Sequence, residues 1–185
     1  MPVADVSEAI LEVLRQGIPP LISREQIGLC SPGDPGDNFL LGLHVYSITR
    51  DNKFQMIRNL VVDSNTSRKP PLCVEISFVV TPYLSKKSGL SDDYKLLDRV
   101  LQIWHDNGAI PYESALQPGF VPLPRVELIS LDPDTISKIW QFPNEPYRTS
   151  LFYKAAPVAI PATLELVTPR VREAVLEADE RRVER

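Results

Sequence analysis

The chain has 185 residues, of which 43% are hydrophobic, and its formal net charge is −4. This length suits one domain that buries roughly 70% of the surface of its unfolded chain. The acidic balance argues against nucleic acid as a partner, because phosphate-binding domains usually carry a basic excess.

The first half of the chain predicts one helix and two long strands. Residues 3–16 form an amphipathic helix, whose apolar side chains recur three and four residues apart. Residues 39–48 are apolar on both faces, as in an interior strand, and residues 72–80 alternate as a strand does. Residues 51–71 between them predict either a long hairpin or a loop. Counted from residue 50, this segment holds two acidic residues and five basic ones, a local charge of +3: Arg50, Lys53, Arg58, Arg68 and Lys69.

A second helix is predicted over residues 91–107, with Ser91 as its N-cap and Asn107-Gly108 at its end. Its apolar side chains form one wide face, as expected of a helix that lies on a sheet. These side chains are Leu96, Leu97, Val100, Leu101 and Trp104. Residues 109–124 show no clear periodicity.

A strand, a short helix and a last strand follow in quick succession. Residues 126–131 are mostly apolar, and Asp132 and Pro133 are typical of the first positions of a helix. Trp140 is expected to anchor that helix to a sheet, and residues 150–156 are the next extended run. The order α-β-β-α-β-α-β favours an α+β fold with a mostly antiparallel sheet packed by helices. Residues 1–160 form the predicted domain, and residues 161–185 a charged tail with helical spacing of its apolar residues.

The residue pattern predicts no catalytic, metal or cofactor site. His44 and His105 are the only histidines, and with Cys30 and Cys73 they show none of the usual zinc spacings. The two cysteines are too few for a disulfide framework and are expected to be buried free thiols. There is no phosphate-cradling glycine loop and no nucleophile elbow. We therefore expect a role in binding or assembly, without an enzymatic activity.

No targeting or membrane-spanning segment is expected. The N-terminus lacks a basic region followed by an apolar run, which argues against a signal peptide. No apolar run approaches the roughly 20 residues that cross a bilayer.

Several short motifs occur in an order that resembles one protein family, over about residues 5–160. An Arg58-Asn59 pair follows the first strand, and a Pro71-Leu72 step opens the next. The most specific stretch is a helix that ends in tryptophan, followed by Pro-Tyr-Arg-x-Ser-x-x-Tyr. It comprises Trp140, Pro146, Tyr147, Arg148, Ser150 and Tyr153. The chain resembles the N-terminal domain of the tube-and-sheath terminator, or cap, proteins of contractile injection systems, which are similar to the tail terminators of contractile-tailed phages.

This resemblance implies a six-fold ring that ends the inner tube and the extended sheath, distal to the baseplate. The implied partners are further copies of the chain, the tube protein and the sheath protein, with a second cap protein left open. Assembly is expected in the cytoplasm, with no membrane insertion of the chain, and the finished particle is left open between cytoplasmic, membrane-anchored and released forms. An assembly chaperone, another structural component of the same machine and a small hydrolase stay open as alternatives. The chain departs from the family pattern at Pro157 and Pro161, which interrupt the second half of the last strand. These prolines put simple pairing of that strand in doubt.

Three sets of residues are assigned to roles in such a cap. Aromatic anchors of the fold are expected at Trp104, Trp140, Tyr147 and Tyr153. Contacts with the ring or tube are expected at Arg58, Arg68 and Lys69. Contacts with the sheath are expected through free strand edges in residues 151–156 and 163–167 and through the tail. The side chains for this contact are Leu151, Tyr153, Leu164, Leu166, Arg170 and Arg172.

Overall fold

The fold was described from a computed structural model, which describes residues 2–34, 36, 38–55, 59–61, 66–84, 89–112, 121–141 and 147–167. The chain divides into two compact units, and each is described by itself. The first unit comprises residues 1–56 and 71–161, and the second comprises residues 57–70 and 162–185.

Three α-helices, one 3-10 helix and eight strands make up the described part of the chain. The helices are α1 (Pro2–Gly17), η1 (Arg24–Gln26), α2 (Leu90–Asp106) and α3 (Pro133–Ile139). The strands are β1 (Ile27–Leu29), β2 (Leu41–Arg50), β3 (Leu60–Val61), β4 (Thr66–Arg68), β5 (Leu72–Pro82), β6 (Arg125–Leu128), β7 (Leu151–Ile160) and β8 (Glu165–Val167).

The first unit is built on a five-stranded sheet in the order β1-β2-β5-β7-β6. The long strands β2, β5 and β7 pair antiparallel, as does β6 with β7, and the short β1 runs parallel to β2. The predicted α+β fold with a mostly antiparallel sheet is thus confirmed. Alternation along β5 sends Ile76, Phe78 and Val80 to one face of the sheet, where all three are fully buried.

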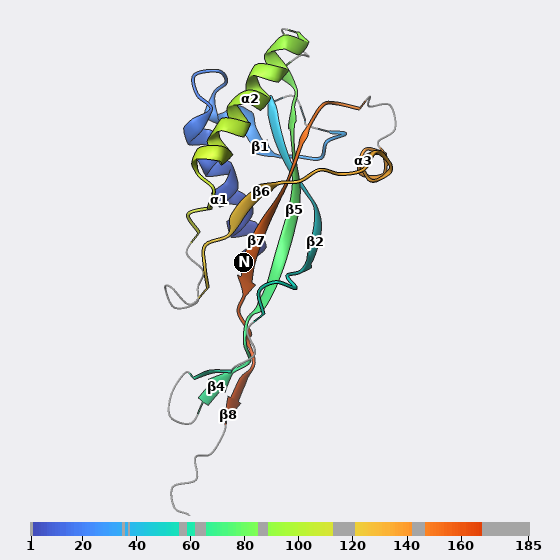
Figure 1. The fold of residues 1–185 in the computed structure, drawn as a ribbon. Helices are drawn as coiled ribbons and strands as arrows, with labels where there is room; N and C mark the ends of the chain where they lie inside the picture. The colour runs from blue at the N-terminus through green and yellow to red at the C-terminus, as the bar shows by residue number, and fades with distance from the viewer. Residues whose placement is uncertain are drawn as a thin grey trace, which may run out of the picture. The chain divides into compact units, whose positions relative to one another are not determined.

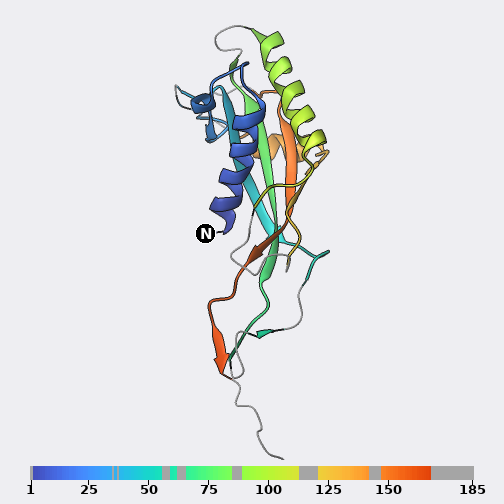
Figure 2. The same ribbon diagram turned by 90° about the vertical axis from the view of Figure 1, so that its left-hand side faces the viewer.

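Helices α1 and α2 cover one face of this sheet and enclose the main core (Figure 1). Figure 2 shows the two helices side by side in front of the strands. The apolar stripe of α1 places Ile10 and Leu14 in the core, and α2 adds Leu96 and Val100. Tyr153 of β7 completes it, with its ring stacked on that of Phe78 at 5.6 Å. The helical period of the apolar residues therefore explains why these two segments pack on the sheet.

Helix α3 lies on the other side of the sheet from α1 and α2 (Figure 1). Helix α3 begins as predicted: Asp132 caps it by accepting a hydrogen bond from the backbone N–H of Thr135 at 2.9 Å, and Pro133 is its first residue. Trp140 ends the helix as its C-cap and is 8% exposed.

The second unit is a three-stranded sheet in the order β3-β4-β8. The antiparallel pair β3 and β4 is a hairpin within the segment that sequence left open between hairpin and loop. Strand β8 joins β4 antiparallel, with Ser67 opposite Leu166. No described residue of this unit is buried, so the small sheet has no hydrophobic core of its own.

Three sequence predictions need correction. Helix α2 begins at Leu90 with Gly89 as its N-cap, one residue before the expected start, because Gly89 at φ +122° supplies the turn into the helix. Leu101 is 37% exposed and does not lie in the core with its neighbours on α2. Strand β7 runs through Pro157 to Ile160 and pairs there with β5, so the proline does not interrupt it. A register shift between Val74 and Ile76 accompanies the proline segment.

Candidate functional site

The small sheet brings together two sets of residues that the sequence assigned to different partners. Arg68, predicted to contact the ring or tube, lies opposite Glu165, which neighbours the predicted sheath residues Leu164 and Leu166. The Arg68 Nε donates to Glu165 Oε1 at 3.0 Å. Because the two side chains are about half exposed, their ion pair contributes little to stability. The pair does, however, neutralise part of the +3 charge that the sequence suggested for this segment.

Apolar side chains are displayed on the same small sheet. Val61 of β3 is 79% exposed, Val167 of β8 is 77% exposed, and Leu164 is 59% exposed. Strands β3 and β8 form the two edges of this sheet, and an unpaired edge is a template for a further strand. A sheet of three short strands without buried residues in its described part gains little stability from its own packing.

The other predicted sheath residues lie elsewhere. Leu151 is half-buried and Tyr153 is 1% exposed, and both belong to β7. Since β7 pairs with β5 on one side and β6 on the other, the expectation of a free edge at residues 151–156 is wrong. Arg58, Arg170 and Arg172 lie outside the described residues. Lys69 is exposed beside β4.

The four predicted aromatic anchors form two pairs. The rings of Trp104 and Tyr153 lie 6.4 Å apart in the main core. The rings of Trp140 and Tyr147 lie 5.7 Å apart in an edge-to-face arrangement. Tyr147 is 55% exposed and Trp140 is 8% exposed, so only one ring of this second pair is open to solvent.

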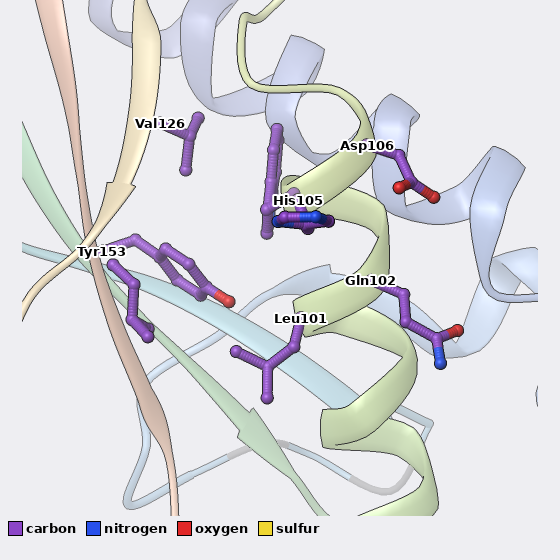
Figure 3. A pocket seen from close by; sticks show the side chains of 8 residues that line it. Leu101, Gln102, His105, Asp106, Val126 and Tyr153 are labelled. Atoms are coloured by element: carbon purple, nitrogen blue, oxygen red, sulfur yellow. The ribbon is translucent and has the colours of Figure 1, made fainter.

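A groove that the sequence did not predict lies between the last two turns of α2 and strand β6. It has a volume of about 500 Å³ and is lined by Leu101, Trp104, His105, Val126, Leu128 and Tyr153, with Gln102 and Asp106 at its rim. Figure 3 shows the Leu101 side chain and the Tyr153 hydroxyl turned toward each other across it. The one feature of the sequence that could have indicated this groove is Leu101. It makes the apolar face of α2 wider than the part of the helix that packs on the sheet.

Two buried polar atoms at the base of this groove have no hydrogen-bond partner among the described residues. These atoms are Trp104 Nε1 and Tyr153 Oη. Burial raises the pKa of the Tyr153 hydroxyl well above its ordinary value, so the group stays protonated and can donate. A buried donor without an acceptor is costly, and two such donors belong to side chains that line this groove.

The titratable groups of the described residues do not resemble an activated nucleophile or a metal site. Burial raises the pKa of the Cys30 thiol to about 11 and also raises that of Cys73, so both thiols are protonated at neutral pH. Burial lowers the pKa of His44, which keeps its imidazole neutral. Within the parts of the chain that the structure describes, no three side chains of the metal-binding types come together.

A charged cluster on the sheet face opposite α1 and α2 also has a structural explanation. Lys154 Nζ lies 3.5 Å from Glu75 Oε2 and 3.2 Å from Glu127 Oε2, on three neighbouring strands. The hydrogen bond with Glu127 is the main cause that raises the pKa of Lys154. Cross-strand ion pairs of this kind help to hold the register of β5, β7 and β6.

Comparisons with known proteins point to one family. A family model described as the Pvc16 N-terminal domain matches residues 5–173. A comparison with curated proteins found no match.

None of the helices in the described ranges is both long enough and apolar enough to cross a membrane.

Two solved structures share the fold. One is the sheath/tube terminator of an extracellular contractile injection system, PVC, in its extended state, with a TM-score of 0.67 and 16% identity. The other is the tube-terminating cap of the anti-feeding prophage, AFP, with a TM-score of 0.68 and 17% identity. The matches cover 97% and 95% of this chain. The chain spans 65% and 61% of the length of those two proteins, respectively.

Proposed function

Because the chain belongs to the Pvc16 N-terminal domain family, we propose that it is a structural cap that ends the tube and sheath of a contractile injection system. This family membership confirms the relationship that the sequence motifs indicated. The observation that carries the proposal is the match of nearly the whole chain to two terminator structures. In this role six copies form a ring at the end of the particle distal to the baseplate.

A closed ring requires a heterologous interface, in which one face of each subunit meets a different face of its neighbour. The large sheet supports such an arrangement, because its two edge strands, β1 and β6, differ in length and in their surroundings. The free protein is expected to be monomeric, with the last tube ring as the template for assembly. Assembly takes place in the cytoplasm, and the cap is then carried as part of the particle.

The small sheet is the proposed contact with the sheath. An extended arm of a sheath subunit pairs with an edge of the β3-β4-β8 sheet and covers the exposed side chains of Leu164 and Val167. Strand addition supplies backbone hydrogen bonds with little demand on sequence. None of the described residues of this sheet is buried, which supports the proposal, because a partner then provides apolar contacts that these residues lack. Arg58 and Lys69 are proposed to face the tube or a neighbouring cap subunit.

This role needs no catalytic residue or cofactor. The raised pKa values of the two cysteine thiols agree with a structural role, since a thiol nucleophile requires a lowered pKa. An assembly chaperone is the alternative from the same machine, and it would be absent from finished particles. Cryo-EM of purified particles tests the proposal: we expect a six-fold ring of this chain at the tube end. Particles whose ends lack the chain, or a ring of another symmetry, would contradict it.

A deletion separates tube capping from sheath contact. Removal of residues 168–185, which contain Arg170 and Arg172, is expected to leave the ring on the tube while extended sheaths are lost or contract. The charges of this tail balance, so its contribution is expected to depend on specific pairing more than on net charge. If the truncated chain still retains full-length extended sheaths, the tail has no part in the sheath contact.

A further inference from the structure

Two buried hydrogen-bond donors at the base of the α2–β6 groove have no acceptor within the described part of the chain. They are the indole Nε1 of Trp104 and the hydroxyl of Tyr153. Trp104 is 5% exposed and Tyr153 is 1% exposed. Figure 3 shows the Tyr153 hydroxyl directed from the sheet toward α2, into the groove. An indole N–H can only donate a hydrogen bond, so the partner that it lacks is an acceptor.

The side chains around these donors favour an acceptor without charge. Among the described residues that line the groove there is no lysine or arginine, and His105 is exposed to solvent. A carboxylate or phosphate group that left water for this site would lack a buried counter-charge, which is costly. The walls are aliphatic at Leu101, Val126 and Leu128. A ligand that fits therefore combines neutral carbonyl oxygens with an aliphatic group.

The mouth of the groove extends this apolar surface beyond the two donors. Leu101 of α2 is 37% exposed, and Leu128 of β6 is 57% exposed. A group that did no more than accept the two hydrogen bonds at the base would leave both leucines in contact with water. An occupant that also covers them gains the free energy of burying their apolar surface. The occupant is therefore larger than the group that the donors bind.

From these observations we propose that the α2–β6 groove binds a peptide segment of a partner protein. One aliphatic side chain of the segment lies between Leu101 and Leu128. The backbone carbonyls on either side of it accept hydrogen bonds from Trp104 Nε1 and Tyr153 Oη. A peptide suits the site because two neutral carbonyls flank each of its side chains, and because its further residues can cover the mouth. The site is independent of the proposed cap function, since it follows from the chemistry of the groove alone.

NMR spectroscopy of the intact chain tests this site, because the chain has two tryptophans and therefore two indole N–H signals. The probe is N-acetyl-leucine methylamide, a blocked leucine with one aliphatic side chain between two neutral carbonyls. We expect it to shift the Trp104 indole signal in a saturable manner. The signal of Trp140, which lies in a separate edge-to-face pair with Tyr147, is expected to stay in place. The variant Trp140→Phe, which keeps one indole signal, assigns the two.

Three related probes separate the parts of the proposal. N-acetyl-glycine methylamide keeps both carbonyls without the aliphatic group, and N-acetyl-leucine ends in a carboxylate. Each is expected to bind about tenfold more weakly than the blocked leucine, or worse, because it loses apolar burial or brings a charge. A blocked pentapeptide with leucine at its centre and serines on each side is expected to bind at least as tightly. If the blocked leucine binds and the pentapeptide does not, the groove is a small-molecule pocket and the peptide proposal is overturned.

Two substitutions in the chain supply the matched measurement. Tyr153→Phe keeps the ring and removes one donor, so it is expected to weaken binding of the blocked leucine about three- to tenfold. Leu128→Glu puts a charge at the mouth and is expected to weaken binding about tenfold or more. The control is Leu90→Glu, at a 66% exposed position on the other end of α2, which is expected to leave binding unchanged. Thermal melting of each variant verifies that the fold is retained.

The outcomes distinguish this site from the proposed function. A saturable shift of the Trp104 signal that both Tyr153→Phe and Leu128→Glu weaken supports the site. No shift with the blocked leucine or the pentapeptide, or an equal effect of Leu90→Glu and Leu128→Glu, would overturn it. Water or another part of the chain would then be the partner of the two donors. The cap function would still stand, because cryo-EM of the particles tests it separately.

Discussion

Substitution of Tyr153 by phenylalanine tests the groove at the level of a single hydroxyl. The ring is 1% exposed, stacks on Phe78 at 5.6 Å and lies 6.4 Å from the ring of Trp104. Phenylalanine keeps these ring contacts and removes the hydroxyl, which has no partner among the described residues. The hydroxyl loses its hydration on folding and gains no hydrogen bond, a cost of about 1–3 kcal/mol.

We therefore expect Tyr153→Phe to raise the free energy of unfolding of the isolated chain by about 1 kcal/mol. For a chain of this length, the corresponding rise in Tm is about 2–4 °C. Urea unfolding followed by tryptophan fluorescence measures this change, and Trp104 beside the substitution reports on the packing. Tyr153→Ala removes the ring as well and is expected to lower the free energy of unfolding by about 3–5 kcal/mol.

The matched control is Tyr147→Phe, because Tyr147 is 55% exposed and its hydroxyl can remain hydrated. This control is expected to change the free energy of unfolding by less than about 0.5 kcal/mol. A loss of stability of 1 kcal/mol or more in Tyr153→Phe would show that the hydroxyl has a partner in the free chain.

Two further predictions concern charge and pH. Arg68→Glu is expected to weaken incorporation of the chain into particles, as measured by immunoblot. If Arg68 acts through its ion pair with Glu165, the double variant Arg68→Glu, Glu165→Arg restores incorporation. A double variant that stays defective would show that Arg68 contacts a partner. The free energy of unfolding is expected to fall as pH rises above about 9, because the unfolded Cys30 thiol ionises near its ordinary value while the folded thiol keeps its proton until about pH 11. Urea titrations between pH 8 and 11 measure this loss, which should be smaller in Cys30→Ala; an equal loss in both proteins would refute the assignment.

The sequence by itself determined the elements whose signal is local. The apolar stripe of α1 and the alternation along β5 follow from helix and strand periods, and both elements formed where the pattern predicted them. Asp132 and Pro133 likewise started α3, since capping and a fixed φ angle act within a few residues. The order of short motifs was also sufficient to identify the family.

Only the tertiary structure decided which strands lie at the edges of a sheet. The apolar pattern of β7 would suit a strand with one neighbour as well as a strand with two. The sequence therefore could not exclude a free edge there. Arg68 and Glu165 are 97 residues apart in the chain, and no local signal relates them. The α2–β6 groove likewise has no local signal. The sequence pattern makes Leu101 and Leu128 look like ordinary core residues. They are left uncovered because of the width of the sheet and the position at which α2 crosses it.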